Sequence, residues 1–132
     1  MRTHHRVEGD DDSGFTLIEL LAVVLIIAVL AAIAIPVFVN QRKKAVESSM
    51  KSDLRPAAHF MEVYFIDTST YPSDITALPG DLEVGEDTVL TVESSGAAPG
   101  TYCLKATNPR AMDPISYDSD RGGLLRPGTD CS

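Results

Sequence analysis

One carboxylate lies within the longest apolar stretch of the sequence, and its chemistry raises the first question about this chain. From Phe15 to Val39 the only residues that are not apolar are Thr16, Glu19 and Pro36. A charged carboxylate among leucine and isoleucine side chains is costly in lipid, most of all at the centre of a membrane-spanning helix. Glu19 therefore either extends to the lipid headgroups or pairs with a cation, and we favour the cation.

The apolar stretch has the length of a membrane-spanning helix. Leu20 to Val39 covers 20 residues, which is about 30 Å as a helix and matches the hydrocarbon thickness of a bilayer. A buried core helix is the alternative, but the 93 residues that follow, 40–132, are too few to surround it. We therefore predict a helix near the N-terminus that is long and apolar enough to span a membrane.

A second helical pattern follows directly. Apolar residues recur there at spacings of 3 and 4, at Val46, Met50, Leu54, Ala57, Met61 and Phe65. These positions form a stripe along one face of an amphipathic helix, so we predict one long helix from about Phe15 to Ile66. Pro36 and Pro56 fall inside it. Because each proline lacks an N–H donor and clashes with the preceding turn, we expect a bend or local loosening at both.

The C-terminal part of the chain has the residue types of β-strands. β-Branched and aromatic residues are frequent in Thr88–Glu93, Thr101–Thr107 and Ile115–Asp118, and Ser94–Gly100 reads as a hairpin loop. Turn-forming residues occur at Asp67–Asp74, Pro79–Gly80 and Ser119–Gly123. Because a small sheet must cover its apolar face, we expect it to pack on the amphipathic stripe. The predicted class is α+β: a long N-terminal helix on a small antiparallel sheet.

Composition excludes several functions. The formal net charge of -8, from 11 Lys+Arg and 19 Asp+Glu, argues against nucleic-acid binding by the isolated chain, because a polyanion would be repelled. The sequence has no nucleophile constellation, no phosphate-binding loop and no metal-ligand spacing on the helix. His4 and His5 lie in the polar N-terminal residues, and His59 is a surface or packing residue rather than a base. We predict no enzyme activity, no catalytic residue and no cofactor.

Two cysteines, Cys103 and Cys131, indicate a disulfide. Their bond would close a loop of about 29 residues, worth about 3–4 kcal/mol in the chain-entropy model. Two unrelated thiols are the alternative, but a bond would anchor the C-terminal tail. The charge bias conflicts with this prediction. Only Arg2 and Arg6 precede the apolar stretch, whereas five cations follow it: Arg42, Lys43, Lys44, Lys51 and Arg55. By the positive-inside rule the region after the stretch would lie in the cytoplasm, where a disulfide does not persist.

The residues Gly14-Phe15-Thr16-Leu17-Ile18-Glu19, with the apolar stretch behind them, resemble the cleavage motif of type IV pilins and their relatives. The likeness continues to Ala45, and more loosely through Thr70-Tyr71-Pro72 and the terminal cysteine pair. It implies a pilin fold, cleavage by a membrane aspartyl (prepilin) peptidase between Gly14 and Phe15, and N-methylation of Phe15. The family orients its leader toward the cytoplasm. This orientation places the cysteines outside the cytoplasm, so it agrees with the predicted disulfide and disagrees with the positive-inside rule.

The resemblance also gives Glu19 a partner. Cleavage would create a cation, the Phe15 amine, about 6 Å along the helix from Glu19. Because a bond within one chain is geometrically awkward, we expect Glu19 to pair with the Phe15 amine of a neighbouring copy. Such a pair would set the axial register between apolar helices more than it would stabilise them. Gly14, which has no side chain, can lie extended against a protease backbone.

Four parts follow from these patterns: a leader peptide (1–14), a hydrophobic transmembrane and filament-core helix (15–39), the amphipathic half of the same helix (40–66) and a β-rich globular region (67–132). The precursor would be a single-pass membrane protein, anchored in lipid with its leader in the cytoplasm. The mature chain would join a filament on the cell surface. Its implied partners are copies of itself, the prepilin peptidase, and the membrane assembly platform and ATPase of a pilus machine.

We predict a structural subunit, the major pilin of a type IV pilus. A pseudopilin of a type II secretion or DNA-uptake system is the alternative, and the family resemblance implies that major pseudopilins hold their C-terminal loop with Ca²⁺ instead of a disulfide. Candidate Ca²⁺ ligands are present at Asp113, Asp118, Asp120 and Asp130, but we favour a solvated acidic loop and no metal.

Two other classes fit less well. A secreted binding protein would use Ala32-Ile33-Ala34 as a signal peptidase site, but Glu19 and the acidic leader argue against it. A permanently membrane-anchored binding protein is the other alternative.

Overall fold

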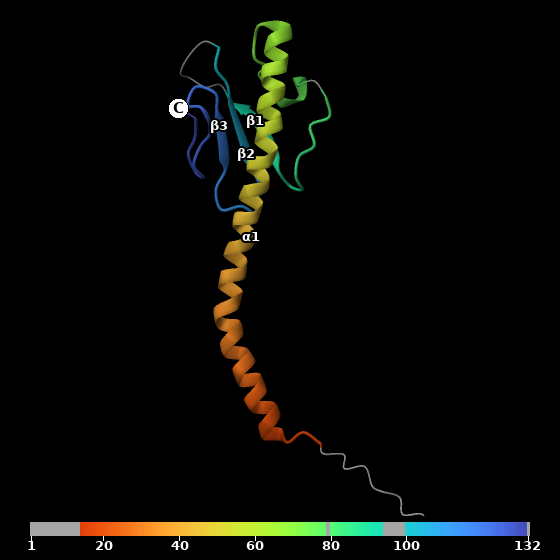
Figure 1. Ribbon diagram of the computed structural model, residues 1–132, viewed down its shortest axis with the longest axis vertical. Helices are drawn as coiled ribbons and strands as arrows, with labels where there is room; N and C mark the ends of the chain where they lie inside the picture. Colours follow the sequence, from red (N-terminus) through yellow and green to blue (C-terminus); the bar gives the residue numbers. More distant parts are fainter. Residues whose placement is uncertain (1–13, 79, 94–99, 132) are drawn as a thin grey trace, which may run out of the picture. The chain divides into compact units, whose positions relative to one another are not determined.

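The computed structural model describes residues 14–78, 80–93 and 100–131 (Figure 1). The chain divides into two compact units, residues 1–37 and 38–132. In chain order the described elements are the helix α1 (Leu17–Thr68), the short 3₁₀ helix η1 (Ile75–Ala77) and the strands β1 (Val89–Glu93), β2 (Cys103–Thr107), β3 (Ile115–Asp118) and β4 (Gly123–Leu124). A long helix followed by a small sheet confirms the predicted α+β class.

The helix α1 is 52 residues long and continuous in its described residues. The predicted range, Phe15 to Ile66, is two residues early at each end. The helix ends where Ser69 takes a left-handed conformation, with φ 58°, and donates its N–H to the Phe65 carbonyl at 2.7 Å. Helical structure continues through Pro36 and Pro56, and a bend at either position stays a prediction.

The sheet is an antiparallel meander with the strand order β1-β2-β3-β4. In its register Leu104 lies opposite Val92 on β1 and Tyr117 on β3. The three predicted strands are present, and β1 and β2 begin one and two residues later than expected. The predicted turn Ser119–Gly123 runs into β4, which was not predicted. Residues 94–99 of the predicted hairpin loop, and Pro79 of the predicted turn, lie outside the described residues.

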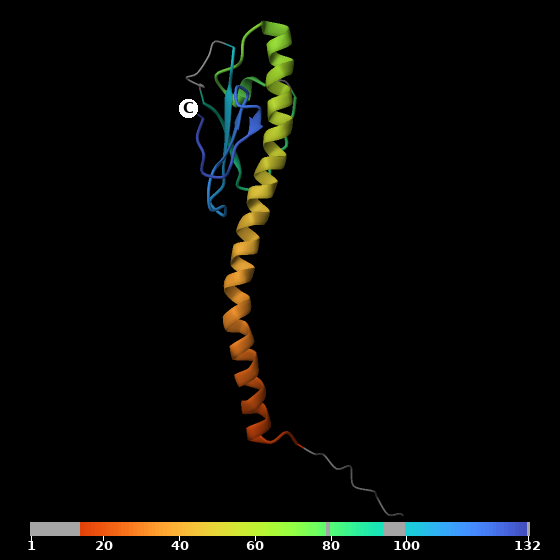
Figure 2. The ribbon, with the colours of Figure 1, turned by 60° about the vertical axis from the view of Figure 1, so that its left-hand side comes forward.

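The second half of α1 covers one face of the sheet (Figure 2). The middle of the predicted stripe, Met50, Leu54, Ala57 and Met61, is completely buried. These residues form one apolar cluster with Leu90, Leu104, Ala106 and Ile115 of the sheet. Val46 is partly buried at one end of the stripe, and at the other end Phe65 stacks on Tyr71 with ring centroids 4.6 Å apart. The predicted packing of the amphipathic half on the sheet is confirmed.

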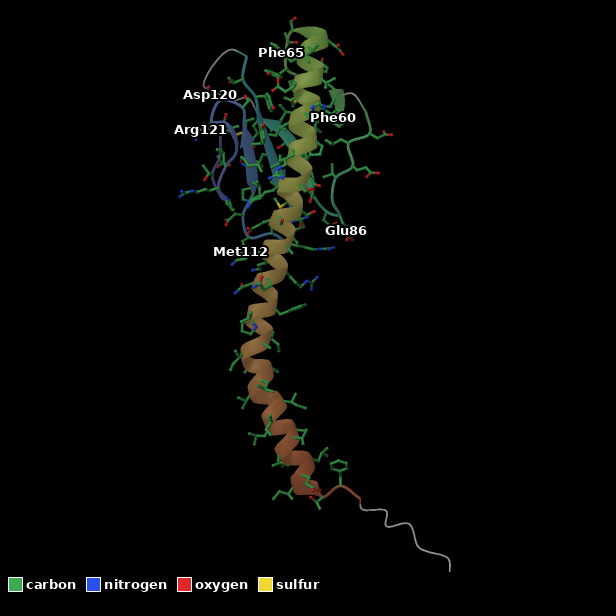
Figure 3. All side chains as sticks on the ribbon, viewed as in Figure 1. Phe60, Phe65, Glu86, Met112, Asp120 and Arg121 are labelled. Carbon is green, nitrogen blue, oxygen red and sulfur yellow. A yellow bond between two sulfur atoms is a disulfide. The ribbon has the colours of Figure 1, made fainter. Side chains whose placement is uncertain are left out.

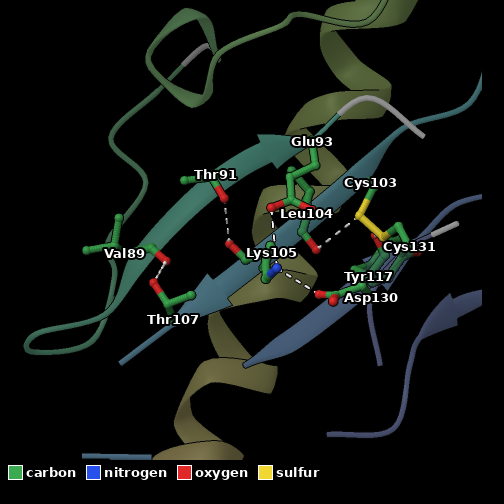
Figure 4. A network of polar contacts seen from close by, with 10 residues as sticks. All are labelled: Val89, Thr91, Glu93, Cys103, Leu104, Lys105, Thr107, Tyr117, Asp130 and Cys131. Atoms are coloured by element: carbon green, nitrogen blue, oxygen red, sulfur yellow. Dashed lines mark hydrogen bonds and ion pairs between the residues drawn. A yellow bond between two sulfur atoms is a disulfide. The ribbon is translucent and has the colours of Figure 1, made fainter. Parts of the chain in front are cut away.

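The C-terminal segment lies along β3 and is tied to β2. The N–H of Leu125 donates to the Ser116 carbonyl at 2.8 Å, and the N–H of Gly128 donates to the Pro114 carbonyl at 3.0 Å. Cys131 then forms a disulfide with the buried Cys103, with Cα atoms 6.1 Å apart (Figure 4). The predicted bond is therefore confirmed.

Candidate functional site

The helix α1 begins with a reciprocal set of hydrogen bonds between Thr16 and Glu19. The Thr16 N–H and hydroxyl donate to Glu19 Oε2 at 2.9 and 2.8 Å, and the Glu19 N–H donates to Thr16 Oγ1 at 3.3 Å. This arrangement is a capping box, which satisfies N–H groups that a helix start leaves without partners. The negative carboxylate also lies at the positive end of the helix dipole. Glu19 is therefore held at the first turn of the helix by its own chain.

Sequence reasoning missed the role of Thr16. The signal was present, because Thr16-Leu17-Ile18-Glu19 has the spacing of a capping box, with Ser or Thr followed three residues later by Glu or Gln. The structure thus brings Glu19 together with Thr16. Whether Glu19 also meets the Phe15 amine of another copy stays a prediction.

The residues at the predicted cleavage point precede the helix. Gly14 and Phe15 are exposed and lie before the first helical residue, Leu17. Among the described residues other than its chain neighbours, no heavy atom lies within 4 Å of the position that a Cβ at Gly14 would occupy. Backbone outside a helix can bind in extended form to a protease, so this geometry is compatible with cleavage at the Gly14–Phe15 bond.

The first half of α1 exposes apolar side chains all round. Exposed large hydrophobic residues run from Phe15 to Val39, and Leu17, Leu20, Leu21 and Val24 border a shallow depression of about 230 Å³. Within the described residues, α1 is the one helix long and apolar enough to cross a membrane, judged by length and composition. A helix with apolar residues on every side needs lipid or other helices around it.

A second polar cluster holds the C-terminal segment (Figure 4). Lys105 Nζ lies 2.7 Å from Asp130 Oδ1 and 3.5 Å from Glu93 Oε1. The hydrogen bond to Asp130 is the main cause that raises the pKa of Lys105 above its ordinary value. Because Asp130 directly precedes Cys131, this ion pair and the disulfide hold the same stretch of tail against the sheet.

Two of the four carboxylates considered as Ca²⁺ ligands lie next to cations of the same chain. Asp118 is buried and its Oδ2 lies 3.8 Å from Arg121 Nε, while Asp130 pairs with Lys105. Among residues 14–78, 80–93 and 100–131, no three His, Cys, Asp or Glu side chains gather as metal ligands would. His59 is exposed on α1, with its ring centroid 6.0 Å from that of Phe60.

Comparison with known proteins agrees with the motif. A family profile described as the prokaryotic N-terminal methylation motif matches residues 10–35. The type IV wide pilus major component PilA4 of Thermus thermophilus is 39% identical over 93 residues, which cover 70% of this chain and 71% of that protein.

Proteins of another system are also similar. The type II secretion system core protein G of Pseudomonas aeruginosa is 38% identical over 61 residues, 46% of this chain and 43% of that protein. Core protein G of Aeromonas hydrophila is 27% identical over 90 residues, 68% of this chain and 57% of that protein.

The fold and the N-terminal site together define an α+β protein with one long helix. The first half of this helix is apolar all round and begins with a capped carboxylate, and its second half packs on an antiparallel sheet. The similarity to the Thermus pilus component extends over two thirds of both chains. This chain belongs to the type IV pilin family.

Proposed function

We propose that this chain is the major structural subunit of a type IV pilus. The observation that carries the proposal is the position of Glu19, the only carboxylate of the apolar segment, in the first helical turn after the Gly14–Phe15 bond. A neutral acceptor would be enough to cap the helix of a simple anchor, whereas the charge of a carboxylate at that place is suited to fix how apolar helices align when copies assemble.

Maturation begins with the precursor in the membrane. The leader, residues 1–14, lies in the cytoplasm, and the C-terminal unit lies on the other side, where the Cys103–Cys131 bond is stable. The prepilin peptidase cuts between Gly14 and Phe15, and the new amine of Phe15 is methylated. The exposure of both residues outside the helix supports this step.

Assembly replaces lipid by neighbouring copies around the apolar half of α1. The Phe15 amine of one subunit approaches the Glu19 carboxylate of the next, so that two charges leave the lipid as a pair. The Thr16 capping bonds support this step, because they hold the carboxylate in one position before a partner arrives. A membrane platform and an ATPase drive extraction from the bilayer, and the filament emerges at the cell surface.

A pseudopilin of a type II secretion system is the second candidate, favoured by the similarity to core protein G. Two observations support the pilin instead. The aligned region covers 71% of the Thermus pilus component but 43% and 57% of the two secretion proteins. In addition, the C-terminal segment is held by a disulfide and by Lys105, with Asp130 engaged as the partner of that cation.

The intact mass of the protein sheared from the cell surface, unreduced and reduced, tests the proposal. We expect a species that starts at Phe15, carries one added methyl group and gains two hydrogen atoms on reduction. A species starting at Ile35 would mean signal peptidase cleavage and a secreted protein. Full-length protein retained in the membrane fraction would mean an anchored protein. Loss of secretion without loss of surface filaments, on deletion of the gene, would favour the pseudopilin.

A further inference from the structure

Three cations form a straight stripe on the second half of α1. Lys44, Lys51 and Arg55 follow one another at spacings of 7 and 4 residues. At about 100° per residue, these spacings keep the three residues within about 40° of one another on one side of the helix, over about 16 Å of its length. Lys44 and Arg55 are exposed and Lys51 is partly exposed. We call these three residues the cation stripe.

The cation stripe is not neutralised by its own chain. Within residues 14–78, 80–93 and 100–131, none of its three side chains forms an ion pair. Glu47 is the carboxylate closest to it in sequence, between Lys44 and Lys51. Glu62 lies two turns beyond Arg55 on the same side of the helix, and its Oε2 accepts the Tyr71 hydroxyl at 3.1 Å. Positive charge therefore predominates along the stripe.

The loop that precedes β1, residues 80–88, has the opposite charge. Its four carboxylates are all exposed: Asp81, Glu83, Glu86 and Asp87. Arg110 compensates part of this charge, because its Nη2 lies 2.7 Å from Asp87 Oδ2 and 3.5 Å from Glu86 Oε1. In the described part of the chain, Asp81 and Glu83 form no ion pair. Residues 80–88, which we call the acidic loop, therefore keep a net negative charge.

The acidic loop lies against the side of α1 that is opposite to the cation stripe. The N–H of Gly85 donates to Asp53 Oδ2 at 3.1 Å, and a Cβ at Gly85 would lie 3.0 Å from Ser49 Oγ. Figure 3 shows Phe60 and the loop residue Glu86 on the same side of α1. Ser49, Asp53 and Phe60 are about 140–180° around the helix from the cation stripe. The acidic loop therefore does not reach the cation stripe of its own chain.

The two charged surfaces lie at the same level along α1. The hydrogen bond from Gly85 joins the acidic loop to the helix at Asp53, which lies between Lys51 and Arg55 of the cation stripe. Two copies side by side can therefore bring the loop of one against the stripe of the other. Because the stripe is about 16 Å long, the contact tolerates an axial shift between the copies.

We propose that the acidic loop of one copy packs against the cation stripe of the next copy, with Asp81 and Glu83 facing Lys51 and Arg55. Because loop and stripe are different surfaces on opposite sides of α1, the contact is heterologous, and its repetition gives an open chain of subunits instead of a closed dimer. Exposed ion pairs add little stability, so the contact selects which sides of neighbouring C-terminal units meet. It rests on the proposed function, since it joins these units in a filament whose apolar helices are already together.

Zero-length crosslinking of assembled filaments tests the contact. A carbodiimide joins an amine to a carboxylate only when the two groups touch, so sheared filaments would be treated with it, digested and analysed by mass spectrometry. The expected product links Lys51 to Asp81 or Glu83. Lys51→Arg is the matched control, because it keeps the charge without a reactive amine, so filaments should form and this link should be lost. The Lys105–Asp130 pair within one chain should be linked in both samples.

Exchange of the charges gives a second test. Glu83→Lys should lower the yield of sheared filament by about tenfold, because like charges then meet at the contact, and Lys51→Glu should do the same. The two changes together should bring the yield back to within about twofold of the wild type. Asp67→Lys is the control, because Asp67 is exposed in the last turn of α1 and its change alters the net charge by the same amount elsewhere.

The outcomes distinguish the contact from the proposed function. Wild-type filaments without a link between Lys51 and the acidic loop, or wild-type amounts of filament from Glu83→Lys, would overturn the contact and leave the proposed function standing. A yield that falls in Lys51→Glu and is not restored by Glu83→Lys would also overturn it, and would make anionic lipid headgroups the partner of the cation stripe. A wild-type chain that forms no filament would instead contradict the proposed function.

Discussion

Thr16 and Glu19 bind each other through three hydrogen bonds at the start of α1, with both Thr16 donors directed to one carboxylate oxygen, Oε2. The pair has two possible consequences that sequence alone does not separate. Glu19 caps the start of the helix, and in the proposed filament it would offer a negative charge to a neighbouring subunit. Capping needs only a hydrogen-bond acceptor, whereas pairing with an amine needs the charge.

Glu19→Gln separates these two roles. Glutamine can complete a capping box, so α1 should begin normally and the peptidase should still cleave the chain. Without the negative charge, we expect the filament yield to fall as far as in Glu19→Ala. Thr16→Ala is the matched variant, because it keeps the charge and loses side-chain capping at a cost of about 1 kcal/mol. Mass spectrometry reports processing and shearing reports assembly. Normal filaments from Glu19→Gln would rule out the charge pair.

The disulfide should dominate the attachment of the C-terminal segment. Changing both cysteines to alanine should lower the unfolding free energy by about 3–4 kcal/mol. Asp130→Asn removes the ion pair with Lys105. Because the side chain of Lys105 is 21% exposed and that of Asp130 is 65% exposed, the loss should cost less than about 1 kcal/mol of unfolding free energy. Denaturant unfolding of the detergent-solubilised chain measures both. Equal losses from the two changes would contradict this ranking.

Stability should fall at alkaline pH because of Tyr102. Burial, and next the negative charge of Glu62, raise the pKa of Tyr102 above its ordinary value. A folded pKa above the unfolded one means that the contribution is complete below about pH 10 and is lost as the pH rises further. Unfolding free energies between about pH 8 and pH 11 should therefore decline less steeply in Tyr102→Phe than in the wild type. The raised pKa of Lys105 acts in the same direction, so Lys105→Met is a useful companion.

Two apolar residues of α1 should respond differently to truncation. Leu54 is completely buried between helix and sheet, so Leu54→Ala should cost about 2–5 kcal/mol of unfolding free energy. Ile66 is exposed, and Ile66→Ala should change the unfolding free energy by less than about 0.5 kcal/mol. Denaturant unfolding of the two variants measures the difference. Losses of similar size from both would contradict the assignment of Leu54 to the core and of Ile66 to the surface.

Chelation should not affect the fold. Asp118 and Asp130 face Arg121 and Lys105, so two of the four candidate Ca²⁺ ligands already have a cation of the same chain beside them. The thermal midpoint of the oxidised chain should be the same in excess EDTA and in millimolar Ca²⁺. A midpoint that rises with Ca²⁺ and saturates would show a bound ion, and it would move the chain toward the pseudopilins.

Local patterns were sufficient to predict the helix, its two halves and three strands. The stripe that includes Met50 and Leu54 depends on helical spacing alone, and Ile115–Asp118 was placed to the residue. The capping box could also have been read from Thr16 and Glu19, since its partners are three residues apart. Such features are determined by neighbours along the chain, so composition and spacing are enough to find them.

Other features came from contacts between distant segments. The strand β4 exists because β3 offers it an edge to pair with, and two residues carry too little periodicity to reveal it. Lys105 meets Asp130 only because the disulfide and the sheet register bring the tail to β2.

The loop before β1 meets the loop after β2 through Arg110, which pairs with Asp87, and through Asn108, which donates to the Glu86 carbonyl. Consecutive residues thus determine the motif at Gly14–Glu19 and the apolar segment. The surfaces that distinguish this subunit are made by packing, which joins residues that no short stretch of sequence contains.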